Sequence, residues 1–198
     1  RLDCAGTSPA RAQAKELTTA NMGMPLRQAD YLVSPRRCTI DSPIGALVLL
    51  ADDSGLTHIL FPSHSLRDLG LSSEDIPKRS DDDVLQTTAS QLAEYFNGDR
   101  KAFELPLHVD GNDFEVDAWF AMRSIPYGET ISYGEQADIA GHPGAFQAVG
   151  AANGRNPLPI VVPCHRVIGS DGSLVGFGGG LDTKRFLLDL ESGVQRLF

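Results

Sequence analysis

A cysteine and a histidine stand side by side at Cys164 and His165, between Pro163 and Arg166. A thiol is a nucleophile only as its thiolate, and a free cysteine with a pKa near ~8.5 needs a neighbouring base or cation to react at neutral pH. Pro163 fixes its own backbone torsion and favours extended geometry at Val162. We therefore predict that Cys164 lies at an ordered bend, with its sulfur presented at the end of an element.

The Cys-His adjacency is a weak signal when taken alone. Successive residues of an extended segment point to opposite faces, so His165 would reach the sulfur only through a water molecule or a turn. A buried, unreactive Cys164 beside a hydrogen-bonded core histidine is the commoner meaning of such a pair. The motifs on either side favour the reactive alternative.

These motifs follow one another in a fixed order. They are Pro126-Tyr127-Gly128-Glu129-Thr130, Ser132-Tyr133-Gly134-Glu135, Ala148-Val149-Gly150, Asn156-Pro157, Pro163-Cys164-His165-Arg166, Gly178-Gly179-Gly180-Leu181 and Leu187-Leu188 with Glu191. From about Phe114 to Glu191 the chain resembles the O6-alkylguanine-DNA alkyltransferase family. The resemblance implies binding of double-stranded DNA that contains O6-alkylguanine, extrusion of that base, and one irreversible transfer of the alkyl group to the protein's own cysteine. O4-alkylthymine is a second candidate substrate. Extrusion is required because the reactive atom of a stacked base is inaccessible.

The resemblance also implies catalytic roles. Cys164 is the nucleophile, His165 takes its proton through a water molecule, and Glu191 orients His165. Asn156 would hold the loop and the thiol network, and Tyr133 would push the phosphate during extrusion and donate a proton to guanine. Taken singly, Glu191 could be a solvated helix residue and Asn156 an ordinary turn residue.

A second set of residues is expected to contact DNA or the extruded base. It consists of Tyr133, Gln147, Ala145, Ala148, Arg166, Phe177 and Gly178. Arg166 is expected mainly to support the surrounding structure through its fixed donors. The glycines at 178–180 are interpreted as a wall that a flat base can approach, with a tight turn as the alternative. They are not a phosphate-binding loop, because the lysine that ends such a loop is missing.

Two positions depart from the family pattern. Gln147 stands where the family usually carries an arginine that fills the gap left by the extruded base. Glutamine lacks the charge and the broad stacking face, so weaker extrusion or binding is expected. Phe177 stands where many members have tyrosine, and we expect a smaller effect there.

The charge of the chain is opposite to that of a typical DNA-binding protein. The net charge is -9, and residues 111–198 carry six Lys and Arg against ten Asp and Glu. A small DNA-binding face remains possible, because backbone amides can also contact phosphates. We therefore predict a modest salt dependence of binding.

The sequence predicts an α+β fold. Strands are expected at Cys38–Ile40, Gly45–Leu50 and Gly55–Phe61, and a helix between Asp81 and Asn97. Further helices are expected at about 113–124, 132–140 and 144–153, followed by a hairpin around 170–172 and a last helix ending near Glu191. The resemblance implies an RNase H-like N-terminal domain and a winged-helix-like C-terminal domain that contains a helix-turn-helix.

The domain organisation is predicted from changes in composition. A flexible tail covers residues 1–36, an α/β domain 37–107, and a DNA-binding and alkyl-transfer domain 108–198. In this family the second helix of the helix-turn-helix enters the minor groove. The small residues Gly144, Ala145, Ala148 and Ala151 would permit a close approach there, with tight packing in the core as the alternative.

No cofactor and no metal are predicted. Cys4 and Cys38 lack histidines at zinc-binding spacing, and the three aspartates at 81–83 suit a helix start better than a metal site. We interpret His58, His64, His108 and His142 as surface or capping residues. No segment is long and apolar enough to cross a membrane, no signal-peptide pattern is present, and a monomer in the reducing cytoplasm is expected.

Two other functions compete with alkyl transfer. A non-catalytic module that extrudes alkylguanine and recruits other factors is the main alternative, and Gln147 leaves room for such a weakened member. The retained Cys164 favours chemistry, because modules of that kind replace the nucleophile. A cysteine hydrolase would need an oxyanion site, and no motif supplies one.

Overall fold

The computed structural model describes residues 33–194, so most of the tail predicted for residues 1–36 lies outside the described residues, as does Cys4. The last part of that segment is in contact with the sheet. The carbonyl oxygen of Val33 accepts a hydrogen bond from the Asp53 amide at 3.3 Å, and Arg36 begins the first strand.

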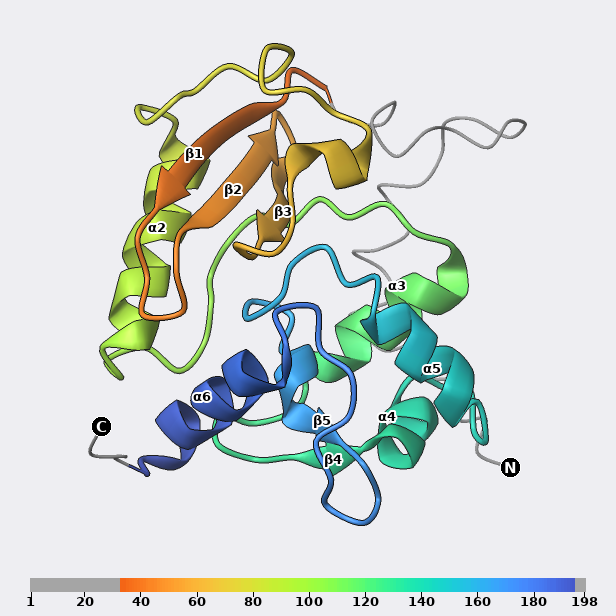
Figure 1. The fold of residues 1–198 in the computed structure, drawn as a ribbon. Coiled ribbons are helices and arrows are strands. Elements are labelled where there is room, and N and C mark those ends of the chain that lie inside the picture. The colour runs from red at the N-terminus through yellow and green to blue at the C-terminus, as the bar shows by residue number, and fades with distance from the viewer. Residues whose placement is uncertain (1–32, 195–198) are drawn as a thin grey trace, which may run out of the picture.

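Three antiparallel strands form the sheet of the N-terminal half, in the order β1-β2-β3 (Figure 1). They are β1 (Arg36–Ile40), β2 (Leu47–Asp52) and β3 (Gly55–Leu60). β2 begins two residues later than predicted. The reason is Gly45, which has a φ of 96° and donates its amide to the Ser42 carbonyl at 3.0 Å, so it belongs to a turn.

Helix α2 (Asp83–Phe96) packs against all three strands of this sheet. Asp82 caps it, because a carboxylate oxygen of Asp82 accepts a hydrogen bond from the Leu85 amide at 3.0 Å. The buried face of α2 carries Leu92 and Tyr95, both fully buried. The predicted helix and its acidic start are therefore confirmed. A single-turn 3₁₀ helix, η1 (Leu66–Leu69), lies in the connection from β3.

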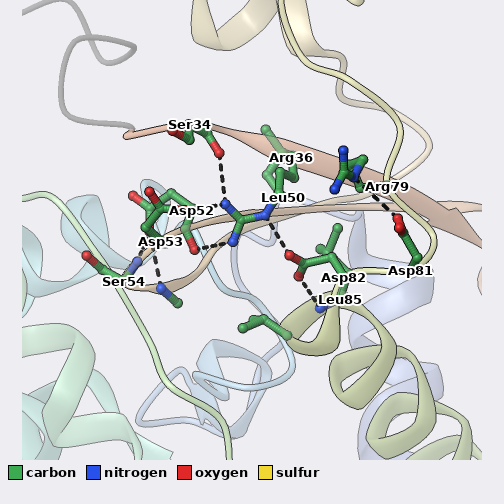
Figure 2. Close-up of polar contacts among 12 residues, drawn as sticks. Ser34, Arg36, Leu50, Asp52, Asp53, Ser54, Arg79, Asp81, Asp82 and Leu85 are labelled. Carbon is green, nitrogen blue, oxygen red and sulfur yellow. Dashed lines mark hydrogen bonds and ion pairs between the residues drawn. The ribbon is translucent and has the colours of Figure 1, made fainter.

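Arg36 ties β1 to two other elements (Figure 2). Its Nε atom lies 2.6 Å from Asp82 Oδ2 at the start of α2, and its Nη1 atom lies 2.6 Å from Asp53 Oδ1 in the β2–β3 turn. Nη2 also donates to the Asp52 carbonyl oxygen at 2.8 Å. Because Arg36 and Asp82 are only 18% and 13% exposed, their charge-assisted hydrogen bond is stronger than a surface ion pair, whereas Asp53 is 59% exposed.

We expect Arg36→Met to lower the free energy of unfolding by about 2–3 kcal/mol, because hydrogen bonds to charged groups contribute about 1.5–3 kcal/mol each and Asp82 also loses a partner. Urea unfolding followed by circular dichroism measures the change. The matched control is Arg79→Met, which removes an exposed pair with Asp81 at 3.3 Å (Figure 2) and should cost no more than about 1 kcal/mol. Equal losses for the two variants would contradict the assignment.

Four helices and a pair of very short parallel strands form the C-terminal half (Figure 1). Their bounds are α3 (Asp113–Met122), β4 (Ile131–Ser132), α4 (Tyr133–Ile139), α5 (Phe146–Asn153), β5 (Val167–Ile168) and α6 (Leu181–Ser192). Helices α3, α4 and α5 pack on one another through a small cluster of fully buried residues: Ala118, Ala137, Val149 and Ala152.

Helices α4 and α5 form the predicted helix-turn-helix. Ser132 and Glu135 make the predicted capping box, with the Glu135 amide donating to Ser132 Oγ at 3.2 Å and the Ser132 amide to Glu135 Oε2 at 2.7 Å. α5 begins at Phe146 instead of Gly144. Gly144 has a φ of 82° and therefore belongs to the turn between the two helices.

One hydrophobic core joins the two halves. Leu49 and Leu56 of the sheet share a cluster with Trp119 of α3 and with Leu158 and Val162 from the segment before Cys164. All five side chains are at most 3% exposed. The predicted α+β fold is confirmed, and the shared core attaches the segment that carries the cysteine to the sheet.

The predicted hairpin after Val167-Ile168 does not form. The turn is present, with the Gly169 amide donating to the Ser173 carbonyl at 2.8 Å, but β5 pairs in parallel with β4. The carbonyl oxygen of Val175 instead accepts hydrogen bonds from Lys184 Nζ at 2.8 Å and from the Tyr133 hydroxyl at 3.2 Å. Side-chain donors thus take the place of a second strand.

The prediction that His58 is a surface or capping residue is wrong. His58 lies in β3 and is 2% exposed, and burial lowers its pKa to about 4, so the ring is neutral at physiological pH. The miss arises because all six residues of β3 are buried, so the strand has no solvent-facing side. None of the helices within residues 33–194 is long and apolar enough to cross a membrane.

Candidate active site

The segment Cys164–Arg166 forms a single turn of 3₁₀ helix, η2, directly before β5. The Cys164 amide donates to the Val162 carbonyl at 2.8 Å, and the Arg166 amide donates to the Pro163 carbonyl at 3.0 Å. The ordered bend predicted from Pro163 is therefore confirmed. This turn places Cys164 at the edge of the hydrophobic core that joins the two halves.

The loop before the cysteine is held by Asn156. Its Nδ2 atom donates to the Val162 carbonyl at 2.8 Å, and its Oδ1 atom accepts from the Leu158 amide at 3.0 Å. The same loop holds Ile160 at a φ of 75°, a left-handed conformation that is costly for a β-branched residue. Such strain is kept only where the surroundings over-determine the conformation, which fits a loop built to position Cys164.

Cys164 is 7% exposed, and its thiol is held in the neutral form by its surroundings. Burial raises the pKa of the Cys164 thiol, whereas a hydrogen bond from Asn156 and the charge of Lys184 act in the opposite direction. The net pKa lies above the ordinary value. A base is therefore needed to remove the proton when the sulfur reacts.

Lys184 of α6 is a residue that sequence reasoning missed. Its side chain is fully buried, and Nζ donates to the carbonyl oxygens of Val167 at 2.7 Å and Val175 at 2.8 Å. Burial lowers the pKa of Lys184, while the Cys164 sulfur raises it again. A signal was present in the sequence, because Lys184, Leu187 and Glu191 recur at helical spacing on the buried face of α6.

His165 is fully buried and faces Glu191. Its Nε2 atom lies 2.7 Å from Glu191 Oε1, while Nδ1 has no hydrogen-bond partner among residues 33–194. Burial lowers the pKa of His165 more than Glu191 raises it, so the imidazole is neutral. With a carboxylate on Nε2, the proton resides there, and the lone pair is left on Nδ1 as a base.

The buried carboxylate of Glu191 is bound by hydrogen bonds from several residues. Arg166 donates to both carboxylate oxygens, through Nε to Oε2 at 2.8 Å and through Nη2 to Oε1 at 3.0 Å. The Tyr95 hydroxyl and the Gly128 amide add donors at 2.7 and 3.1 Å. Burial alone raises the pKa of Glu191, but the hydrogen bonds from His165 and Arg166 outweigh it and lower the pKa to about 2.

Arg166 supports the hydrogen bonds of Glu191 and is not among the residues that line the cavity beside Cys164. It is 6% exposed, and its third hydrogen bond goes from Nη1 to the Ile125 carbonyl at 2.6 Å. Its expected contact with DNA or the base stays a prediction, whereas its inward position agrees with the expected support role. The physical reason is that a buried carboxylate must be paired, which draws the guanidinium inward.

A cavity of about 490 Å³ opens beside Cys164. Its lining residues come from α4, α5 and the loop before α6: Tyr133, Phe146, Gly150, Asn153, Gly154, Cys164, Val175, Gly176, Phe177 and Gly178. Tyr133, Phe177 and Gly178 of the predicted set therefore meet at one cavity with the cysteine. Volumes of this order are typical of small-ligand sites.

The cavity walls fit the sequence-based interpretation of the glycine run in part. A Cβ atom at Gly178 would lie 3.2 Å from the His64 ring, which is tight, and Gly180 has a φ of 86°. The stretch therefore contains a turn, and the missing side chain at Gly178 makes room for His64, while the approach of a flat base to these glycines stays a prediction. Phe177 stacks at 5.4 Å from Phe61 and at 6.5 Å, edge on, from His165, so the aromatic wall is anchored in the core.

Tyr133 stands at the start of α4, half-buried at the cavity. Burial raises the pKa of its hydroxyl, with the Cys164 sulfur adding to the shift, so the group is a proton-bearing donor. The hydroxyl donates to the Val175 carbonyl at 3.2 Å. Lys184 Nζ lies 6.0 Å from the centre of the Tyr133 ring.

The residues considered for close approach, in α5 and just before it, lie on the surface, whereas Ala152 of the same helix is fully buried. Gly144, Ala148, Ala151 and Gln147 are exposed, and Ala145 is half-exposed. Tight packing in the core, the alternative considered for this stretch, is therefore wrong for Gly144, Ala148 and Ala151. Gln147 does not line the cavity. No group of three or more His, Cys, Asp or Glu side chains that could hold a metal occurs within residues 33–194.

Two family models match the chain along most of its length. Residues 36–109 match "6-O-methylguanine DNA methyltransferase, ribonuclease-like domain", and residues 113–193 match "6-O-methylguanine DNA methyltransferase, DNA binding domain". Neither match includes the segment before residue 36.

Curated relatives and solved structures agree with these models. A protein of Mycobacterium tuberculosis named methylated-DNA–protein-cysteine methyltransferase is 48% identical over 157 residues, which cover 77% of this chain and 90% of the relative. A Methanosarcina barkeri protein of the same name is 45% identical, covering 79% and 97%. The crystal structure of Mycobacterium tuberculosis OGT in complex with DNA superposes with a TM-score of 0.71 at 45% identity and covers 80% of this chain and 92% of that one.

Proposed function

The chain belongs to the 6-O-methylguanine DNA methyltransferase family, and from this premise we propose that it repairs DNA by moving the alkyl group of O6-alkylguanine irreversibly to Cys164. Each molecule acts once, because the product is a stable thioether. The observation that carries the proposal is the position of Cys164, at the wall of an apolar cavity with a buried His165–Glu191 pair behind it. Double-stranded DNA containing the lesion is the partner.

In the proposed reaction, the Cys164 sulfur forms a bond to the alkyl carbon while the bond from that carbon to guanine O6 breaks. The thiol proton passes through a water molecule to Nδ1 of His165, and Glu191 holds the ring in the tautomer that leaves Nδ1 free. Guanine gains one proton from Tyr133 as it departs. The Tyr133 oxygen takes a proton back from solvent, and His165 releases to solvent the proton that came from the thiol. The proton lost by the thiol thus balances the proton gained by guanine, so no cofactor is consumed.

Tyr133 is proposed as the donor of the proton to guanine. Its raised pKa keeps the hydroxyl protonated, and neutralising the departing base lowers the barrier. Asn156 and Lys184 act on the sulfur, because each lowers the pKa of Cys164 against the effect of burial. They are positioning residues, as are Glu191 and Arg166, since none of these four contacts the alkyl group in the proposed reaction.

DNA binding is proposed for the exposed face of α5. The small side chains of Ala145 and Ala148 allow the helix backbone to approach a groove, while Gln147 stands beside them. Phe177 and Gly178 would face the extruded base. We further propose the division into domains at 37–107 and 108–198, a monomeric state and a location in the cytoplasm.

The alternative function is an alkylguanine-binding module without chemistry, and Gln147 is the feature that favours it. Mass spectrometry separates the two functions. After incubation with a duplex containing O6-methylguanine, we expect one methyl group on the Cys164 peptide and none on the Cys164→Ala variant. Lesion binding with an unmodified Cys164 would overturn the proposed transfer and favour the module. Absence of both would exclude both.

A further inference from the structure

Phe146 is an apolar side chain that the fold leaves in water at the edge of the active-site cavity. It is the first residue of α5 and is 51% exposed, yet it lines the cavity together with Gly150 and Asn153. These three positions share one stripe of the helix, since they are spaced at i, i+4 and i+7. Phe146 thus stands at the mouth and the other two stand deeper.

A second side chain that lines this cavity is also apolar and exposed. Val175, from the loop before α6, is 49% exposed and lines the same cavity. Only six large hydrophobic side chains within residues 33–194 are exposed, and two of them line this one cavity. Exposed apolar groups gathered at one opening mark a binding surface.

The rest of the exposed face of α5 is small or polar. Gly144, Ala148 and Ala151 present almost no side chain, and Gln147 presents a neutral amide. Phe146 is therefore the one large apolar group that projects from this helix, all of which the structure describes. A DNA groove that closes over these small residues would also contact the phenyl ring of Phe146.

We propose that Phe146 is the wedge that enters the base stack and occupies the gap left by the extruded guanine, with Gln147 hydrogen-bonding the orphaned partner base. The inference rests on the proposed function. A phenyl ring can stack on the flanking bases, as apolar wedges of minor-groove proteins do, whereas a glutamine amide offers donors and acceptors but little stacking surface.

The test compares a substrate that needs a wedge with one that does not. Single-turnover methyl transfer to Cys164 is measured with duplex O6-methylguanine DNA and with the free base O6-methylguanine. For Phe146→Ala we expect the duplex rate to fall between about fivefold and a hundredfold, the range that loss of one base–aromatic stack implies. The free-base rate should fall by a clearly smaller factor, because the free base needs no wedge even though Phe146 lines the cavity, and Phe146→Trp should retain the duplex rate.

Three outcomes would overturn the wedge. A duplex rate for Phe146→Ala within about twofold of the rate of the protein with Phe146 would exclude the wedge role. An equal loss on duplex and free base would make Phe146 a wall of the base pocket. A large loss for Gln147→Ala with none for Phe146→Ala would return the wedge to position 147.

Failure of the proposed function is recognised separately through binding. In a Cys164→Ser background, fluorescence anisotropy gives the preference for the lesion duplex over undamaged duplex, with and without Phe146→Ala. If the unmodified protein transfers no methyl group but Phe146→Ala abolishes the lesion preference, the transfer is overturned and the wedge is supported. If the preference is unchanged by Phe146→Ala, the wedge is overturned.

Discussion

Glu191→Gln is expected to lower the free energy of unfolding by about 3–5 kcal/mol, the cost of leaving one partner of a buried ion pair uncompensated. Arg166 is 6% exposed and would keep its positive charge with no carboxylate to pair with it. The amide NH₂ group of glutamine would also face the N–H donors that now bind the carboxylate. For a domain stabilised by about 5–15 kcal/mol this is a large loss. Urea unfolding followed by tryptophan fluorescence measures it.

The same variant should also slow methyl transfer, because His165 loses the acceptor that fixes its proton on Nε2. A loss of about 10²-fold or more is expected where a base is left in the wrong tautomer. The pH dependence of the rate separates this effect from misfolding, since the folded fraction does not alter the apparent pKa of the base. Glu129→Gln, the same change at an exposed position, is the matched control. An unchanged rate profile in folded Glu191→Gln protein would contradict the orienting role.

The pairing of Glu191 also determines how the stability of the fold changes in acid. The pKa of Glu191 falls from 4.5 to about 2 on folding. Because the folded-state value lies below the unfolded one, the stability from this carboxylate is present above about pH 4.5 and is lost as the pH falls through about 2. The pH dependence of the unfolding midpoint should therefore flatten over this window in Glu191→Gln.

Lys184→Met is expected to raise the pKa of the Cys164 thiol further, because the positive charge of Lys184 lowers this pKa. Lys184 acts against the burial that already raises the pKa, so its removal leaves less thiolate at neutral pH. Methyl transfer at neutral pH should therefore fall and should recover as the pH rises.

The pH profile of Cys164 alkylation by iodoacetamide tests the charge effect without DNA. Peptide mass spectrometry assigns the modification to Cys164, so that Cys38 does not contribute. A purely structural role of Lys184, through its bonds to Val167 and Val175, would lower stability but leave the alkylation profile in place. The matched control is Arg185→Met, which removes the exposed cation next in the chain. An unshifted profile in Lys184→Met would exclude the electrostatic role.

Much of the fold was readable from local signals. Ser132 and Glu135 have capping-box spacing, Asn97-Gly98 ends a periodic helix, and Pro163 imposes a bend, and each of these acts over a few residues. Local signals failed where a distant side chain intervened. The hairpin expected around 170–172 has no second strand, and side-chain donors of Lys184 and Tyr133 bind the Val175 carbonyl instead.

The sequence by itself determined the family, the reactive thiol and the His165–Glu191 pair, because those residue types and their order carry the chemistry. Only the tertiary structure decided which way each side chain faces. It turned Arg166 inward to neutralise Glu191, buried Lys184 beside the sulfur, and left Phe146 in solvent at the cavity mouth. Burial and charge pairing depend on elements distant in the chain, and spacing along one segment does not encode them.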